Sequence, residues 1–115
     1  MNEIKIITDK ISKDELRKMA QTLFGNLVKA VVDCEKRILV IGGELHADEE
    51  QLLLEQGSKQ QDLWGINLYP DVNGDDWIEF DSMINIRPSQ ANRSRGVESS
   101  EIQNCIRGIV NERTE

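Results

Sequence analysis

Apolar residues in the first third of the chain recur with the period of a helix. Ser12 to Glu15 have the form of a capping box, in which the Ser12 hydroxyl accepts a hydrogen bond from the Glu15 N–H. From there to about Glu35, apolar side chains follow at steps of three and four residues, at Leu16, Met19, Ala20, Leu23, Leu27, Ala30, Val31 and Cys34. This stripe predicts one long amphipathic helix over residues 14–35.

Two short apolar segments flank this predicted helix. Residues 1–9 contain three isoleucines in a β-branched run that polar residues end, which is typical of a strand. Residues 37–43 contain the unbroken apolar run 38–41, which indicates a central strand covered on both faces. A strand, a helix and a second strand in this order predict a parallel crossover unit with a right-handed connection.

The second half of the chain shows the alternation of strands that have one face in water. Apolar and polar residues alternate in the segments 63–69 and 77–87, and the segment between them is rich in turn-forming residues. The two strands are therefore expected to form an antiparallel hairpin. On its polar face, Gly65 leaves room for another group to approach the backbone.

Two shorter helices complete the predicted fold. Asp48 is placed to cap a helix that carries three consecutive leucines and ends at Gly57. A last helix over 100–112 carries a second apolar stripe and is capped by Ser99 or Ser100. The order βαβαββα predicts a single globular α+β domain over residues 1–115. We expect a small mixed sheet with a parallel βαβ crossover, a C-terminal antiparallel hairpin, and helices on one face.

Composition and charge limit the partners that the protein is expected to have. The chain has 21 acidic and 14 basic residues, and eleven of the acids lie in residues 44–81 beside a single lysine. An acidic protein of this kind is not expected to bind nucleic acid, which requires a basic face. The longest apolar run has four residues, far below the ~18 that a membrane span needs. The start of the chain also lacks the pattern of a signal peptide, so no membrane partner is predicted.

The two cysteines, Cys34 and Cys105, are too few for a disulfide scaffold. A reducing compartment is therefore expected, and the protein is predicted to be cytoplasmic. Both cysteines fall in the apolar stripes of predicted helices, where a thiol packs as a small hydrophobic group. We interpret both as structural.

The first candidate site surrounds His46, the single histidine of the chain. Glu44, His46 and Asp48 are spaced two residues apart and would project from one face if the strand continued through them. A neutral imidazole beside carboxylates can act as a general base or join them as a metal ligand. Asp48 is expected to cap a helix, which would turn its side chain away from Glu44 and His46. No metal site is therefore predicted. The candidate catalytic residues are His46, Glu44 and Asp81.

The second candidate site is the loop 87–96, which carries three arginines, two serines and two amide side chains but no acid. Arginine forks bind carboxylate or phosphate, and the N-terminus of the following helix would add positive potential. With the polar face of the hairpin, the loop forms a candidate anion site of Asn67, Arg87, Ser89, Gln90, Asn92, Arg93 and Arg95. The alternative is that the arginines pair with the protein's own acids, for example Glu79 or Asp81.

Three stretches of the sequence resemble a known family. They are GGELHAD at 42–48, GSK and DLWGINLYP between 57 and 70, and NIRPSQ and NRS between 85 and 94. The family consists of short prokaryotic proteins catalogued only as a domain of unknown function, and the resemblance covers nearly the whole chain. It implies no catalytic residue, cofactor or substrate.

Two classes of function remain open. The first is a non-catalytic binding or regulatory module that holds a small anionic ligand or an acidic partner segment through the arginine loop. The alternative is a small hydrolase in which His46 is the acid/base, Glu44 or Asp81 orients it, and Arg87 or Arg93 supports an oxyanion. No cofactor is predicted, because no phosphate-binding glycine loop or metal-ligand spacing is complete.

Overall fold

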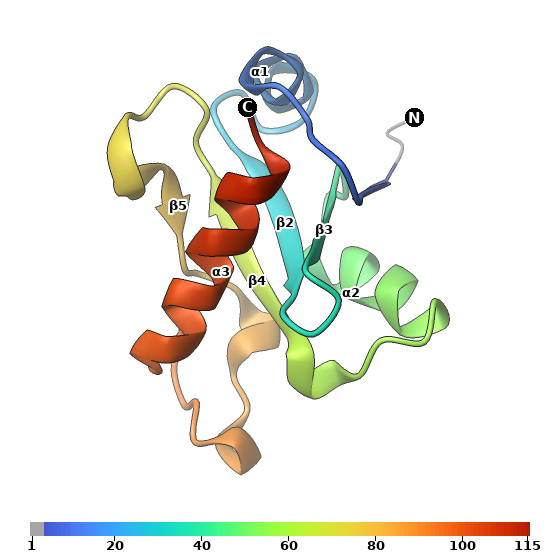
Figure 1. Ribbon diagram of the computed structural model, residues 1–115, viewed down its shortest axis with the longest axis vertical. Helices are drawn as coiled ribbons and strands as arrows, with labels where there is room; N and C mark the ends of the chain where they lie inside the picture. Colours follow the sequence, from blue (N-terminus) through green and yellow to red (C-terminus); the bar gives the residue numbers. More distant parts are fainter. Residues whose placement is uncertain (1–3) are drawn as a thin grey trace.

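A computed structural model of the chain describes residues 4–115, which form one five-stranded sheet and three helices (Figure 1). The sheet order is β1-β3-β2-β4-β5, and every neighbouring pair is antiparallel. The strands are β1 (Lys5–Ile7), β2 (Val28–Asp33), β3 (Ile38–Ile41), β4 (Leu63–Leu68) and β5 (Ile78–Glu79). The helices are α1 (Lys13–Leu23), α2 (His46–Glu55) and α3 (Ser100–Arg113), joined by loops with short 3-10 turns.

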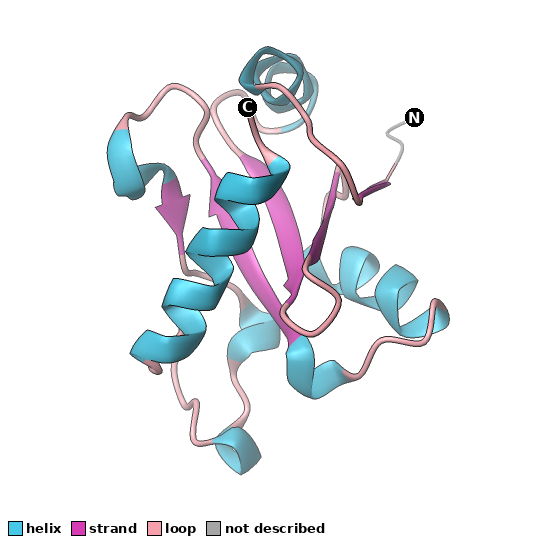
Figure 2. Ribbon diagram, viewed as in Figure 1, coloured by secondary structure: helices cyan, strands magenta, loops and turns pink. Residues whose placement is uncertain are grey.

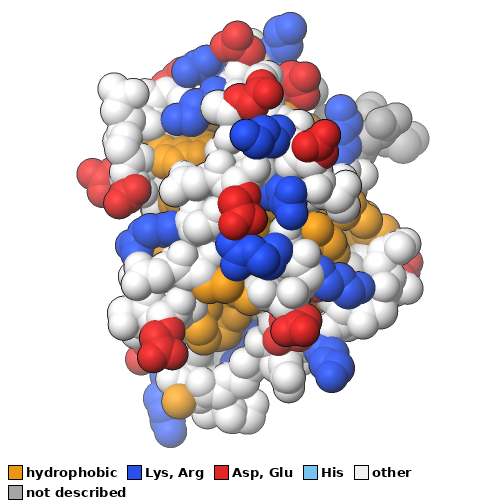
Figure 3. Space-filling model, in the orientation of Figure 1, with side chains coloured by type: hydrophobic (Ala, Val, Ile, Leu, Met, Phe, Trp, Pro, Cys, Tyr) orange, Lys and Arg blue, Asp and Glu red, His pale blue; other side chains and the backbone are white. Residues whose placement is uncertain are grey.

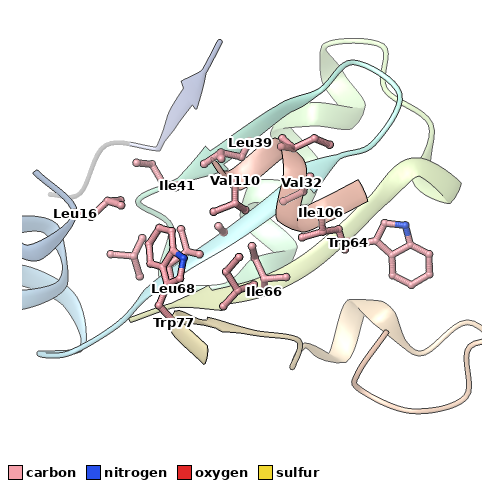
Figure 4. Close-up of a cluster of buried hydrophobic side chains, with 14 of the residues drawn as sticks. Leu16, Val32, Leu39, Ile41, Trp64, Ile66, Leu68, Trp77, Ile106 and Val110 are labelled. Atoms are coloured by element: carbon pink, nitrogen blue, oxygen red, sulfur yellow. The ribbon is translucent and has the colours of Figure 1, made fainter. Parts of the chain in front are cut away.

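Helices cover both faces of the sheet (Figure 2). On one face, α1 and α3 pack against alternate side chains of the central strands, with Leu16, Ile106 and Val110 in the larger apolar cluster (Figure 4). On the other face, Leu53 of α2 meets Val31 and Val40. The expectation that helices lie on one face is therefore wrong. Central strands that are apolar on both faces need cover on both faces.

The predicted helix over 14–35 is wrong in its second half. α1 begins as expected after the Ser12 hydroxyl cap, but it ends at Leu23. Gly25 follows in the left-handed conformation, with φ 94°, and its N–H bonds back to the last turn of the helix at 2.6 Å. The residues beyond form β2, whose valines pack on both faces of the sheet. Their spacing fits a helix only by coincidence.

The predicted parallel crossover is wrong for the same reason. Because β2 replaces the second half of the helix, a tight turn joins it to β3, and in this turn the Arg37 N–H donates to the Asp33 carbonyl at 2.9 Å. β3 then pairs antiparallel with both β1 and β2. The fold is α+β, with the order βαββαββα and a sheet that is entirely antiparallel.

The predicted hairpin forms, but its second strand is short. β4 matches the prediction, and β5 pairs with it antiparallel over two residues before the chain leaves the sheet. The Asn85 side chain then makes the hydrogen bonds to the β4 backbone that a neighbouring strand would make. Its Oδ1 accepts from the Gly65 N–H at 2.8 Å, and its Nδ2 donates to the Gly65 carbonyl at 2.9 Å. The segment predicted as strand over 80–87 is thus a loop that packs over the backbone of Gly65.

Gly65→Ala is expected to lower the free energy of unfolding by about 2–3 kcal/mol. A Cβ at this position would lie 2.6 Å from both Cβ and Oγ of Ser82, so the covering loop would have to move. Urea unfolding measures the effect. Gly96→Ala is the control, because its Cβ would lie no closer than 3.4 Å to a neighbouring atom. Equal stability of the two variants would contradict this account of Gly65.

Candidate functional site

A pocket of about 210 Å³ lies beside the first turn of α2, on the face of the sheet that this helix covers. Its polar walls come from β2, α2, β4 and the loop after β5, and consist of Lys29, His46, Asn67, Asp81, Ser82 and Arg95. We call it the His46 pocket. It brings together four residues that the sequence assigned to two separate sites, namely His46, Asp81, Asn67 and Arg95.

His46 is the first residue of α2, and its imidazole is buried, with 8% of the residue exposed. Its Nε2 lies 2.7 Å from the Ile66 carbonyl, which can only accept, so Nε2 carries a proton. Burial disfavours the imidazolium and lowers the pKa of His46, although the bond to Ile66 acts in the opposite direction. The ring is therefore a neutral group with a fixed orientation.

The helix begins earlier than the sequence indicates, which changes the role of Asp48. The N-cap is Leu45, and no side chain caps the first turn of α2. The expectation that Asp48 caps this helix is wrong, because Asp48 lies inside its first turn with an exposed side chain. His46 and Ala47, the first two residues of this turn, line the pocket. The N–H groups of the first residues of a helix have no partner within the helix.

Asp81 and Arg95 form an ion pair in the wall of the pocket, with 2.6 Å between Oδ1 and Nε. Both side chains are about half exposed, so the pair adds little to stability. This is the internal pairing that the sequence left open for the arginines. Glu44, the third candidate catalytic residue, lines a different pocket with Lys29 and Phe24. The structure therefore places His46 and Asp81 in one pocket and Glu44 outside it.

Asn67 also lines the pocket, and one of its polar atoms has no hydrogen-bond partner among the described residues. The residue is 7% exposed, and its Nδ2 donates to Glu79 Oε1 at 2.9 Å and to the Asp81 carbonyl at 3.3 Å. These two acceptors fix the orientation of the amide. Its Oδ1 is buried and has no hydrogen-bond partner among residues 4–115. A buried acceptor without a donor is costly, and a bound molecule that supplies the donor would relieve the cost.

Arg87 lies away from the pocket, and its contacts stabilise the fold. Its guanidinium donates to the backbone carbonyls of Ile84 at 3.0 Å and Gln60 at 2.7 Å, and also to that of Leu63. It stacks on the Trp64 ring, with 4.7 Å from Cζ to the ring centroid. These contacts occupy the guanidinium group that was predicted to bind an anion.

The rest of the loop 87–96 divides into internal and exposed residues. Asn92 is buried and donates from Nδ2 to the backbone carbonyls of Asn85, Ser94 and Gly96. Its Oδ1 accepts from the Glu98 N–H. Gln90 bonds the carbonyl of Gln61. Ser89 and Arg93 have exposed side chains and do not line the His46 pocket. Of the predicted anion-binding set, Asn67 and Arg95 line this pocket.

Sequence reasoning missed Lys29 and Ser82 as pocket residues. Lys29 was assigned to a helix, whereas in β2 it points to the same face as Val31 and lies at the pocket. The signal that could have revealed it is Gly25, which ends the helix before residue 28. Ser82 lies in the loop that was predicted to be a strand.

Within residues 4–115, no three His, Cys, Asp or Glu side chains are grouped so that they could hold a metal ion. In the same range, every helix is too short or too polar to cross a membrane.

The model of one protein family, described as Protein of unknown function (DUF5674), matches residues 5–113. The chain belongs to this family. The match confirms the resemblance that the three sequence stretches indicated. No curated protein and no solved structure matches the chain. Because DUF5674 carries no described activity, the function of this member has to be inferred from its pocket.

Proposed function

We propose that the protein is a non-catalytic binding module for a small anionic ligand, and that the His46 pocket is the binding site. The ligand would be a carboxylate or phosphate that also carries a hydrogen-bond donor. The observation that carries the proposal is that the residues lining one pocket include two cations, an uncapped helix N-terminus and an asparagine with an unpartnered buried oxygen.

Three sources of positive potential support an anion in this pocket. Lys29 and Arg95 supply full charges, and the first turn of α2 supplies backbone N–H groups and the positive end of the helix dipole. Asp81 is the opposing charge, and it already pairs with Arg95. A ligand anion would compete with Asp81 for this guanidinium and would also be attracted by Lys29 and the helix N-terminus.

The unpartnered Oδ1 of Asn67 supports the second requirement, a donor on the ligand. Its amide nitrogen is held by Glu79 and Asp81, so the side chain cannot turn over to present a donor instead. An ammonium, amide or hydroxyl group on the ligand would satisfy this oxygen. A small amino-acid-like molecule meets both requirements.

The hydrolase alternative has weaker support. The Nε2 proton of His46 is donated to a backbone carbonyl, and Asp81 is engaged by Arg95. A general base needs a free nitrogen facing its substrate and a group that orients the ring from the other side. Here the Ile66 carbonyl orients the ring, a role that the hydrolase hypothesis gave to Glu44 or Asp81. The catalytic roles of His46, Glu44 and Asp81 stay predictions.

Arg95→Ala is expected to weaken anion binding by about tenfold or more, since one charge-assisted contact contributes ~1.5–3 kcal/mol. Thermal shift and calorimetric titration with phosphate, citrate and glutamate at fixed ionic strength would measure it. Arg93→Ala is the matched control, because it removes the same charge two residues away and outside the pocket.

Asp81→Asn provides a second test, because it should strengthen anion binding where Arg95→Ala weakens it. It removes the acid that competes for Arg95, so the same probes should bind more tightly than to the wild type. If no probe shifts the wild-type melting temperature, or if Arg93→Ala and Arg95→Ala weaken binding equally, then the His46 pocket is not an anion site.

A further inference from the structure

Lys29 and Asn67 are neighbours across the sheet at the His46 pocket. In the antiparallel pairing of β2 with β4, the residue opposite Lys29 is Asn67, and both residues line the pocket. Residues directly opposite each other in a sheet have Cβ atoms about 4.5–5.5 Å apart. A cationic side chain and an asparagine with an unpartnered buried oxygen therefore lie side by side.

This arrangement decides which kind of donor suits the oxygen of Asn67. The Nδ2 atom donates to Glu79 Oε1 at 2.9 Å, on the side of β5. The Oδ1 atom is on the other side of the planar amide, and the strand on that side is β2, which carries Lys29. A ligand ammonium at Oδ1 would be repelled by the Lys29 ammonium. A neutral amide N–H avoids this repulsion, so an amide is the better donor.

Exposed apolar side chains gather next to these polar groups. Among residues 4–115, five large apolar side chains are exposed, and three of them, Phe24, Leu45 and Met83, line the His46 pocket or the pocket beside it. Exposed apolar surface that gathers at a pocket is typical of a binding site for an apolar group. The ligand is therefore expected to carry an apolar group close to its anion.

The pocket beside the His46 pocket gives the ligand room to extend. It has a volume of about 420 Å³, and it shares Lys29 and Leu45 with the His46 pocket. The Lys29 Nζ lies 5.0 Å from the centre of the Phe24 ring, so this side chain reaches from one pocket toward the apolar wall of the other. A ligand that begins in the His46 pocket can continue past Leu45 toward Phe24.

The opposite face of the molecule has a different distribution of charge. On the face that carries α3, acidic and basic side chains are interspersed (Figure 3). An approaching anion meets both signs of charge there, so their attraction and repulsion largely cancel. The His46 pocket lies on the other face of the sheet, with α2.

We infer that the two pockets together bind the free carboxyl terminus of a peptide whose last residue is apolar. The inference rests on the proposed function and names the class of ligand that the His46 pocket takes. The last residue of such a peptide carries a carboxylate, an amide N–H and an apolar side chain on one α-carbon, and these are the three groups that the site selects. Capture of a carboxyl terminus by backbone N–H groups is a recurrent mode of peptide recognition.

Each part of the peptide terminus has a partner in the site. The carboxylate binds at the first turn of α2, near Lys29 and Arg95. The amide N–H of the last residue donates to Asn67 Oδ1, and its side chain packs on Leu45 and Met83. The preceding residues run into the neighbouring pocket.

Calorimetric titration with short ligands tests the inference. The acetylated tripeptide Ala-Ala-Leu should bind, and its carboxyl amide should bind at least about tenfold more weakly, because the charge-assisted contacts are lost. Acetyl-leucine should bind more weakly than the tripeptide, since it does not reach the neighbouring pocket. Free leucine should bind more weakly still, since its ammonium lies beside Lys29. Equal affinity within any of these three comparisons would overturn the inference.

A variant of Met83 separates this inference from the proposed function. Met83→Gln should weaken binding of the tripeptide by about fivefold and leave the affinity for phosphate unchanged. Ile86→Gln is the matched control, because Ile86 is another exposed apolar residue of this loop and lines neither pocket. Equal binding of the tripeptide by the two variants would overturn the inference.

The same titrations show which of the two proposals fails. If phosphate and citrate bind and depend on Arg95, but the tripeptide binds no better than its amide, then the peptide inference is wrong and the anion site stands. If neither these anions nor the tripeptide binds, the proposed function is wrong as well.

Discussion

Replacing Arg87 with alanine is expected to lower the free energy of unfolding by about 3–5 kcal/mol, a large fraction of the total for a domain of this size. Arg87 is 8% exposed, and its guanidinium bonds three backbone carbonyls, two in the segment 60–63 and one at Ile84. Alanine would remove these three hydrogen bonds, and each buried acceptor that is left unpaired costs about 1–3 kcal/mol.

The ring and the acid beside Arg87 add to this expected loss. The guanidinium stacks on Trp64, and it lies 3.9 Å from Glu50 Oε2, a buried atom that has no hydrogen-bond partner among the described residues. Removing the cation would leave that carboxylate with no charge to balance it. Arg87→Lys keeps the charge but not the planar fork, so it should cost roughly half as much as alanine.

Urea unfolding of the two variants measures the effect, with Arg93→Ala as the control. Arg93 lies on the same loop and its side chain is exposed, so its loss should change the free energy of unfolding by less than about 0.5 kcal/mol. If Arg87→Ala were as stable as Arg93→Ala, Arg87 would be an ordinary surface cation. The loop would then hold its position by other contacts.

The elements that local signals define were predictable from the sequence. The Ser12 cap of α1 and the Ser99 cap of α3 both form, the latter with a 3.3 Å bond from the Ile102 N–H. β2 was not recognised, because a strand that is buried on both faces shows no alternation, and its spacing then fits a helix equally well. One misassigned element changed the topology, since the parallel crossover depended on it.

The candidate site was predictable in its residue types but not in its grouping. Side-chain chemistry singled out His46, Asp81, Asn67 and Arg95, which share the pocket. In a strand over 77–87, Arg87 would lie on the same face as Asp81, but the chain leaves the sheet after β5 and this alternation is lost. Whether an arginine is free to bind a ligand depends on tertiary contacts, which a local sequence pattern does not show.

Glu49 is a fully buried carboxyl group in α2 that sequence reasoning did not single out. Its Oε2 accepts from the Gly43 N–H at 2.9 Å, while its Oε1 has no partner among residues 4–115. Gly43 is needed for this contact, because a Cβ there would lie 2.8 Å from Glu49 Cγ. Burial raises the pKa of Glu49 well above its ordinary value, although the Gly43 bond acts in the opposite direction.

This raised pKa should make the protein less stable as the pH rises. Above the ordinary pKa of glutamate, the unfolded chain has released the proton that the folded protein still holds on Glu49. Over that range, up to the raised pKa of the folded state, the free energy of unfolding should fall by up to about 1.4 kcal/mol per pH unit from this group. Below the range, both states are protonated and the contribution of Glu49 to the pH dependence disappears.

Glu49→Gln is therefore expected to be more stable than the wild type at neutral pH, by a margin that grows as the pH rises. The amide keeps an acceptor for the Gly43 N–H but cannot ionise, so it removes the slope that Glu49 causes. Urea unfolding at several values between about pH 5 and 8 measures the slope. Glu55→Gln removes the same charge from an exposed position on the same helix and should leave the slope as it is. Parallel stability curves for the wild type and Glu49→Gln would mean that Glu49 is ionised inside the fold and stabilised by a partner other than Gly43.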